Sequence, residues 1–148
     1  IVRNPWSRFF SHFNYLLKWK IKYENRNAEE SWDQNMERQG FEAKRLFDAH
    51  KTDEKIIQVL VNVHISQYDY LTDLNGEFLP HFCAQIENLD KDFKTFCSYV
   101  GLSQDINLKH SNKNSGNSKS YQEFYNNKSR LMIENYEKKI VEMFEYTF

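Results

Sequence analysis

Glycine, proline and cysteine are all scarce in this chain of 148 residues, which holds four, two and two of them respectively. So few glycines and prolines, together with abundant aromatic residues, favour a compact and mainly helical body over a disordered one. The two cysteines, Cys83 and Cys97, have neither metal-ligand spacing nor the density of a secreted disulfide scaffold. We therefore expect both to be reduced, half-buried apolar residues, and we expect no metal site.

Long apolar runs and a bias in charge are also missing. No run is long enough to cross a bilayer, so we expect no transmembrane segment in this chain. The formal net charge at pH 7 is −1, which gives no basic field that would favour a nucleic-acid partner. The sequence also has no glycine-rich phosphate loop of the P-loop kind. Its length corresponds to one domain.

The first eleven residues have the pattern of an anion-binding site. A β-branched pair is followed by Arg3, an Asn-Pro step and a helix-like run that carries Ser11. Where a strand turns into a helix, backbone N–H groups and the helix dipole favour an anion, and a guanidinium and a hydroxyl add charge and direction. Asn4 suits the N-cap of this helix and Pro5 its first turn. Apolar residues at three- and four-residue steps extend the helix through Leu17.

Two later stretches accompany this pattern. Residues 85–102 contain Glu-Asn-Leu, Asp-Phe and Gly-Leu in turn, and residues 121–146 run from Tyr-Gln-Glu-Phe-Tyr to Met-Phe-Glu-Tyr. Together with the spacing of Arg3 and Ser11, they resemble, in the same order, the sulfotransferases that use 3′-phosphoadenosine 5′-phosphosulfate (PAPS). The sequence around Arg3 is most similar to the membrane-associated, carbohydrate-type branch of that family and to its bacterial relatives.

The resemblance implies an α/β fold, with a P-loop-like nucleotide-binding parallel sheet and flanking helices. This chain, residues 1–148, would be mostly the helical C-terminal part of one sulfotransferase domain. The loop for the 5′-phosphosulfate and the main catalytic base would precede it. The implied reaction transfers a sulfonyl group from PAPS to a hydroxyl of a carbohydrate or glycan acceptor and leaves adenosine 3′,5′-bisphosphate.

The resemblance also assigns residues. Arg3 and Ser11 would hold the 3′-phosphate of the nucleotide, whereas Arg8 would hold the fold together through backbone carbonyls or a carboxylate. The alternative is that Arg3 is a surface cation and Ser11 a small helix residue, because motif matches this short are often accidental.

The segment before His64 has features of both a strand and a helix. Residues 56–65 are rich in β-branched residues, as a buried strand would be, but the polar residues before them indicate a helix start. We expect a helix that ends near Asn62. The segment that begins at His64 resembles the family's His-x-x-Pro-Gln segment, with Ser66 in the place of the proline. That segment runs near the acceptor in the family, so His64 would act as a general base or hydrogen-bond partner for the acceptor hydroxyl. The alternative is a structural histidine.

Residues 78–86 follow an Asn-Gly turn and are expected to form a strand of the nucleotide-binding sheet. Pro80 would limit the first part of that strand to an edge. Glu87 at its end would pair with Arg3 or Arg8 and orient it. A helix is expected from about residue 90, with Gly101 as its C-terminal cap.

Residues 103–120 are rich in Asn, Ser and Lys, a composition typical of a mobile loop. In the resemblance, the loop before the last helix folds over the cofactor, so Lys113, Ser118 and Lys119 would contact its phosphates. The alternative is an ordinary disordered connection. Apolar residues at helical spacing then predict one closing helix, capped near Asn127, that packs in the core.

Residues 24–55 are polar and predict one or two amphipathic helices separated near Gly40, which either shape the acceptor cleft or form a solvated insertion. The rivals to a sulfotransferase are a non-catalytic helical interaction domain and a nucleotide-binding pseudo-enzyme fragment. The free cysteines and the Asn/Lys-rich composition favour the bacterial cytoplasm over the Golgi lumen.

Overall fold

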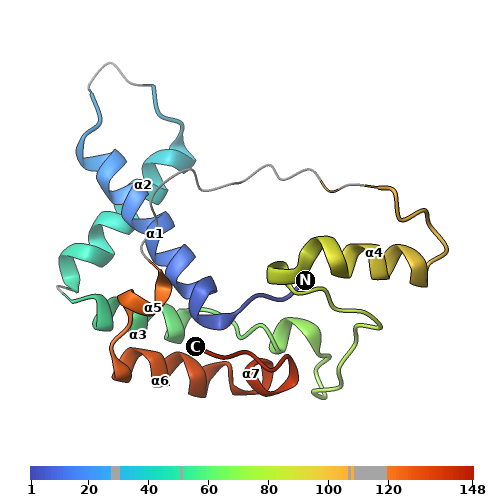
Figure 1. Cartoon of the computed structure of the whole chain (residues 1–148). Helices are drawn as coiled ribbons and strands as arrows, with labels where there is room; N and C mark the ends of the chain where they lie inside the picture. Colours follow the sequence, from blue (N-terminus) through green and yellow to red (C-terminus); the bar gives the residue numbers. More distant parts are fainter. Residues whose placement is uncertain (28–30, 51, 107, 109–119) are drawn as a thin grey trace.

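The computed structural model describes residues 1–27, 31–50, 52–106, 108 and 120–148. Most of these residues are helical. The helices are α1 (Pro5–Glu24), α2 (Gln34–Ala49), α3 (Asp53–Val63), α4 (Leu89–Tyr99), α5 (Tyr121–Phe124), α6 (Asn127–Tyr136) and α7 (Lys138–Met143), with 3₁₀ turns at Asp69–Leu71 and Ile86–Asn88. Figure 1 shows α1 and α2 rising together, α3 and α6 beneath them, and α4 to one side.

Helix α1 organises the molecule, and its start is encoded locally. The Asn4 side chain accepts a hydrogen bond from the Ser7 N–H at 3.1 Å, and Pro5 follows the cap, so both expectations for this helix start are confirmed. The buried face of the helix carries Trp6, Phe9 and Phe13. Recurrence at three- and four-residue steps places these rings on one side of the helix.

The core lies where α1, α3 and α6 meet. Its buried members are Trp6, Phe9, Phe13, Ile56, Ile57, Leu60, Val61, Tyr125 and Ile133. Two buried polar groups are satisfied there, because the Trp6 indole donates to the Arg130 carbonyl at 3.0 Å and the Tyr125 hydroxyl donates to the Trp6 carbonyl at 2.8 Å. The expected helix in the β-branched segment is confirmed: α3 is capped by Thr52 and buries Ile56, Ile57, Leu60 and Val61.

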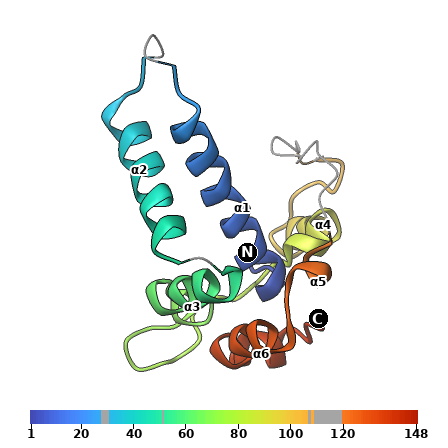
Figure 2. The same cartoon turned by 90° about the vertical axis from the view of Figure 1, so that its left-hand side faces the viewer.

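Helices α1 and α2 form an antiparallel hairpin that extends away from the core (Figure 2). Gly40 allows the two helices to approach closely, since a Cβ atom at this position would lie 2.6 Å from the Tyr23 ring. The cap of α2 is Asp33, whose side chain accepts a hydrogen bond from the Met36 N–H at 2.8 Å. Two helices therefore do form in the polar segment, but Gly40 lies inside α2 and does not separate them.

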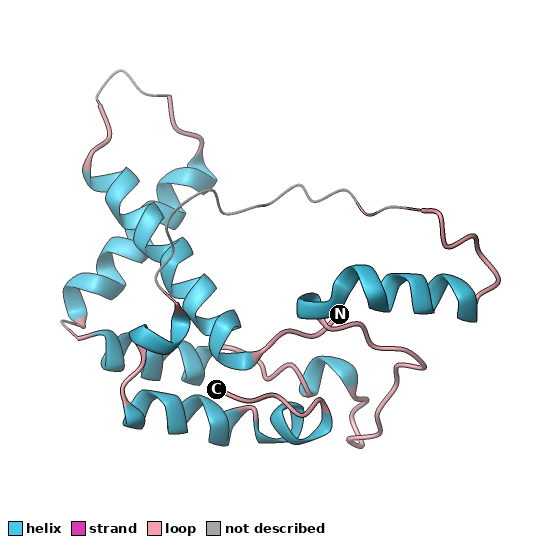
Figure 3. Cartoon of the chain, viewed as in Figure 1, coloured by secondary structure: helices cyan, strands magenta, loops and turns pink. Residues whose placement is uncertain are grey.

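The predicted parallel sheet is wrong for the described residues, which contain no strand (Figure 3). Two isolated bridges are present: Val2 pairs with Gln85 in parallel, and Thr72 pairs with Phe78 in antiparallel. The Val2 N–H donates to the Ala84 carbonyl and the Ile86 N–H donates to the Val2 carbonyl, at 2.8 and 2.9 Å. Residues 78–86 thus pair only at their two ends, and the stretch around Pro80, which lacks one N–H donor, does not join the two bridges into a strand.

The second half of the chain contains one confirmed cap and one corrected helix. Gly101 follows α4 with φ +76°, and the N–H groups of Gly101 and Leu102 donate to the Ser98 and Cys97 carbonyls, as in a Schellman cap. The predicted single closing helix is interrupted at Glu137, which separates α6 from α7. Among the described helices, none combines the length and the apolarity that crossing a bilayer requires.

Candidate functional site

A pocket of about 300 Å³ opens at the N-terminal half of α1. It is lined by Arg3, Arg8, Phe9, Ser11, His12, Tyr15 and His64. Three of these, Arg3, Ser11 and His64, are the described residues that the sequence singled out. Arg3 comes from the stretch before α1, Ser11 from the helix itself and His64 from the C-cap of α3. Lys113, Ser118 and Lys119 lie outside the described residues.

One face of α1 supplies most of the lining. Arg8, Ser11, His12 and Tyr15 are separated by three, one and three positions, so their side chains lie along one side of the helix. The sequence pointed to Ser11 and did not single out His12 or Tyr15. Their signal was available: a polar stripe at i, i+3, i+4 and i+7 runs beside the apolar stripe that faces the core.

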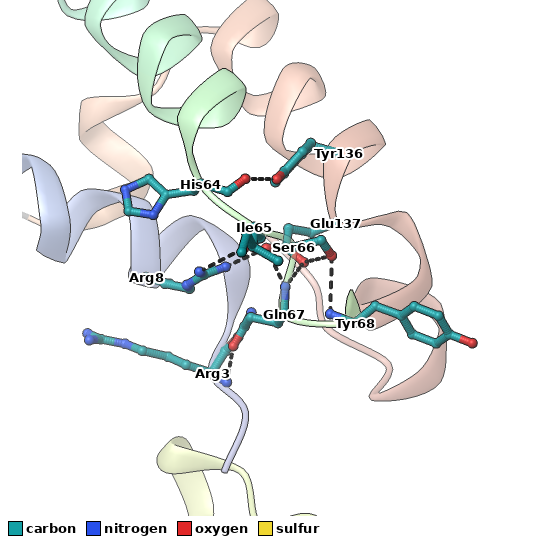
Figure 4. Close-up of polar contacts among 9 residues, drawn as sticks. All are labelled: Arg3, Arg8, His64, Ile65, Ser66, Gln67, Tyr68, Tyr136 and Glu137. Atoms are coloured by element: carbon teal, nitrogen blue, oxygen red, sulfur yellow. Dashed lines mark hydrogen bonds and ion pairs between the residues drawn. The ribbon is translucent and has the colours of Figure 1, made fainter. Parts of the chain in front are cut away.

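The backbone of Arg3 is clamped by one side chain. The Arg3 N–H donates to Gln67 Oε1, and Gln67 Nε2 donates to the Arg3 carbonyl, both at 2.9 Å (Figure 4). The guanidinium of Arg3 donates to Ser7 Oγ at 3.2 Å from Nε and 3.0 Å from NH2. No carboxylate of the described residues forms an ion pair with Arg3. Its backbone is therefore fixed while its positive charge is not neutralised.

Arg8 is held very differently. Its NH1 group donates to Glu137 Oε1 at 2.6 Å, and its NH2 group donates to the Ile65 carbonyl at 3.2 Å. Glu137 is fully buried and also accepts hydrogen bonds from the Ser66 hydroxyl at 2.9 Å and from the Gln67 N–H at 3.1 and 3.2 Å. The predicted role of Arg8, holding the fold through a carbonyl or a carboxylate, is confirmed.

Glu137 is a residue that the sequence did not reveal. Burial raises the pKa of Glu137, and the Ser66 hydroxyl and the Arg8 guanidinium oppose that rise. The expected partner of the arginines, Glu87, instead accepts from the Asn4 N–H at 2.7 Å and from the Tyr146 hydroxyl at 3.1 Å, so that expectation is wrong. Glu137 offsets the charge of Arg8, whereas Arg3 forms no ion pair with any carboxylate in the part of the chain that the structure describes.

The two histidines of the pocket lie against each other. Their ring centroids are 4.4 Å apart at an interplanar angle of 82°, an edge-to-face arrangement. The backbone carbonyl of His64 accepts a hydrogen bond from the Tyr136 hydroxyl. Nε2 of His64 is buried and has no hydrogen-bond partner among the described residues.

Burial and neighbouring charge keep both imidazoles neutral near pH 7. Burial, followed by the neighbouring His64 and the Arg8 cation, lowers the pKa of His12 to about 4. Burial, followed by the Arg8 cation, also lowers the pKa of His64. A neutral imidazole has a free lone pair, so His64 is in the form that accepts a proton.

The chemistry of the pocket is that of an anion site with a proton acceptor. Its described lining combines the Arg3 guanidinium, a hydroxyl and two neutral imidazoles, and it contains no carboxylate. No cluster of three or more His, Cys, Asp or Glu residues that would hold a metal occurs in the described part of the chain.

No protein-family model, curated protein or solved structure matches this sequence.

Proposed function

We propose that this pocket binds the 3′-phosphate of PAPS and that the protein acts in sulfonyl transfer from PAPS to a hydroxyl of a carbohydrate or glycan. One observation carries the proposal. The motif comparison singled out Arg3, Ser11 and His64. His64 is far from the other two in the sequence, yet all three line one pocket. An accidental motif match gives no reason for such convergence.

Arg3 and Ser11 have the chemistry that recognition of a 3′-phosphate requires. A guanidinium that no carboxylate neutralises can place two N–H donors on phosphate oxygens, and a nearby hydroxyl adds a third donor. The two hydrogen bonds from Gln67 fix the Arg3 backbone, from which the side chain extends. Less conformational entropy of Arg3 is then lost when it binds a phosphate. The sequence holds no glycine-rich loop for the 5′ group, so the proposal rests on the 3′ end of the nucleotide.

His64 is proposed as the group that serves the acceptor. In sulfonyl transfer the acceptor oxygen bonds to sulfur, the bond between sulfur and the 5′-phosphate oxygen breaks, and the hydroxyl proton leaves to a base. An imidazole in the same pocket is suited to form a hydrogen bond with that hydroxyl and to orient it. Positioning and cations that stabilise charge on the leaving phosphate supply the rest of such a reaction.

A titration separates this proposal from its rivals. Adenosine 3′,5′-bisphosphate should bind the chain ten- to a hundredfold more tightly than 5′-AMP, because a charge-assisted contact to phosphate contributes roughly 1.5–3 kcal/mol. Isothermal calorimetry or chemical-shift perturbation measures both affinities. The variant Arg3→Ala should bind the two nucleotides equally, while Arg45→Ala, an exposed arginine of α2 outside the pocket, should keep the preference.

Equal binding of both nucleotides by the unmodified chain would refute the assignment of Arg3. Failure of a folded chain to bind either nucleotide would support the helical interaction domain instead. A pseudo-enzyme would keep the 3′-phosphate preference and yet transfer no labelled sulfonyl group from PAPS to any glycan acceptor.

A further inference from the structure

We propose that His12 and His64 act as one proton acceptor in this pocket, and that the pair takes up a proton when a phosphate dianion binds beside Arg3. The inference rests on the proposed function, because it concerns the same anion pocket. It adds a residue, His12, that no motif assigned, and it makes binding of the phosphate depend on pH.

The geometry places both imidazoles where an anion would meet them. His12 directly follows Ser11 on α1, and His64 approaches from the end of α3, so both rings line the pocket. Their centroids are 4.4 Å apart, so a charge on one ring disfavours a charge on the other. The pair therefore titrates as a unit and holds at most one proton over the ordinary pH range.

The charged and titratable groups around the pair favour its neutral form when the pocket is empty. On α1, Arg8 lies on the same helix face as His12, and Tyr15 stacks near His12 with centroids 6.2 Å apart. Arg3 lines the pocket from the N-terminal stretch. From α6, the Tyr136 hydroxyl contacts the carbonyl of His64 and carries no negative charge at neutral pH.

Glu137 is the carboxylate that pairs with Arg8 beside the histidines, and its contacts direct it elsewhere. Both of its oxygens are occupied by Arg8, Ser66 and the Gln67 N–H, inside the protein and away from the open pocket. Its charge therefore offsets that of Arg8 and does not hold a proton on the histidines. A negative partner for the imidazoles has to come from the ligand.

A phosphomonoester supplies that negative charge. Its second ionisation lies near pH 6, so at pH 7 and above it is mainly a dianion. Placed against the pair, a dianion stabilises an imidazolium by charge attraction. Because the pKa of each histidine is lowered in the empty pocket, affinity should by linkage fall as pH rises from the pKa of the free pair towards its pKa in the complex, by up to tenfold per pH unit.

The first experiment uses the unmodified chain. The C2–H resonances of its histidines are followed by NMR from about pH 5 to 9, with and without saturating adenosine 3′,5′-bisphosphate. The pair should titrate at higher pH in the complex, whereas His81, which is exposed and lies outside the pocket, should titrate at the same pH in both states. An unchanged titration of the pair in the complex would overturn the inference.

Calorimetry in two buffers of different ionisation enthalpy then counts the protons. At about pH 7 the unmodified chain should take up on the order of one proton per bound bisphosphate. The variant with both His12→Gln and His64→Gln should take up none, and each single variant should take up less than the unmodified chain. The control His81→Gln should behave as the unmodified chain, and circular dichroism checks that every variant is folded.

The outcomes for the two proposals are distinguishable. A chain that prefers the bisphosphate to 5′-AMP but takes up no proton keeps the proposed function and loses this inference. A double variant that is folded and still takes up a proton also overturns the inference. A chain that does not bind the bisphosphate at all loses both.

Discussion

The two ends of α1 use charge in opposite ways. At the N-terminal end, Arg8 is paired with the fully buried Glu137, a residue 129 positions away. At the far end, Arg26 pairs with Glu37 across the hairpin and Lys44 pairs with Asp48 within α2, all on exposed side chains. The first arrangement assembles the pocket from three parts of the chain, and the second stays within one hairpin.

The comparison shows what a charged residue contributes in each setting. Exposed pairs are screened by water and lose much of their attraction to side-chain entropy. A buried carboxylate that accepts four hydrogen bonds from three residues fixes the position of each donor, and removing a donor leaves it uncompensated. The aromatic rings at the far end, among them Trp19, Tyr23 and Trp32, pack the hairpin without such long-range constraint.

The largest effect should come from breaking the buried pair. Arg8→Leu leaves Glu137 buried without its cation, so the free energy of unfolding should fall by about 3 kcal/mol, the lower end of the range because the Arg8 side chain is 24% exposed. Urea unfolding followed by circular dichroism measures the change. Arg26→Leu, which breaks the exposed pair with Glu37, is the matched control and should change stability little. Similar losses in the two variants would remove the distinction between the two ends.

A smaller effect should come from the two helix caps. Asn4 is 6% exposed, caps α1 and also donates from Nδ2 to the Thr147 carbonyl at 3.2 Å, so Asn4→Ala should cost about 2 kcal/mol. Asp33, the exposed cap of α2, makes only the capping bond among those described, so Asp33→Ala should cost about 1 kcal/mol or less. Thermal and urea unfolding of both variants check the order, and a larger loss for Asp33→Ala would reverse the comparison.

The smallest effect should come from the hairpin contact. Gly40→Ala gains up to about 1 kcal/mol of helix propensity, but the new Cβ would lie 2.6–2.9 Å from Tyr23 atoms, including the Tyr23 Cβ that a ring rotation does not move. We expect a net loss of about 1 kcal/mol, with nucleotide binding at the pocket unchanged. Glu42→Ala, at an exposed position of the same helix, should be nearly neutral. A stabilised Gly40→Ala protein would show that the hairpin adapts at no cost.

Local signals explain what the sequence predicted correctly. The Asn-Pro start of α1, the helix in residues 53–63 and the glycine cap after α4 each depend on a few adjacent residues. The sheet was expected from the family resemblance, with residues 78–86 as one of its strands. A strand needs a partner over its length, and here pairing is limited to isolated bridges at Phe78 and Gln85. Sequence patterns report the preference of a segment and not whether a neighbour is present to satisfy it.

The candidate site was predictable in part for the same reason. Arg3 and Ser11 stand at a spacing that a motif can capture, and His12 and Tyr15 belong to a helix stripe that could have been read. Glu137 lies at the junction between α6 and α7, and its role depends on Arg8 and on Ser66, 71 positions away. Nothing local distinguishes it from the exposed glutamates of the chain, so only the fold reveals it.

The bond between Asn4 and Thr147 joins residues 143 positions apart, which bears on the order of events as the protein folds. The α1–α2 hairpin closes a short loop, whereas the Arg3–Gln67 contact at the pocket spans 64 positions and the Arg8–Glu137 pair that supports it spans 129. Closing long loops costs more entropy and slows folding. We expect the hairpin to form early and the pocket to form only near the end. A chain growing from its N-terminus would therefore carry Arg3 and Ser11 for most of its synthesis before they become a binding site.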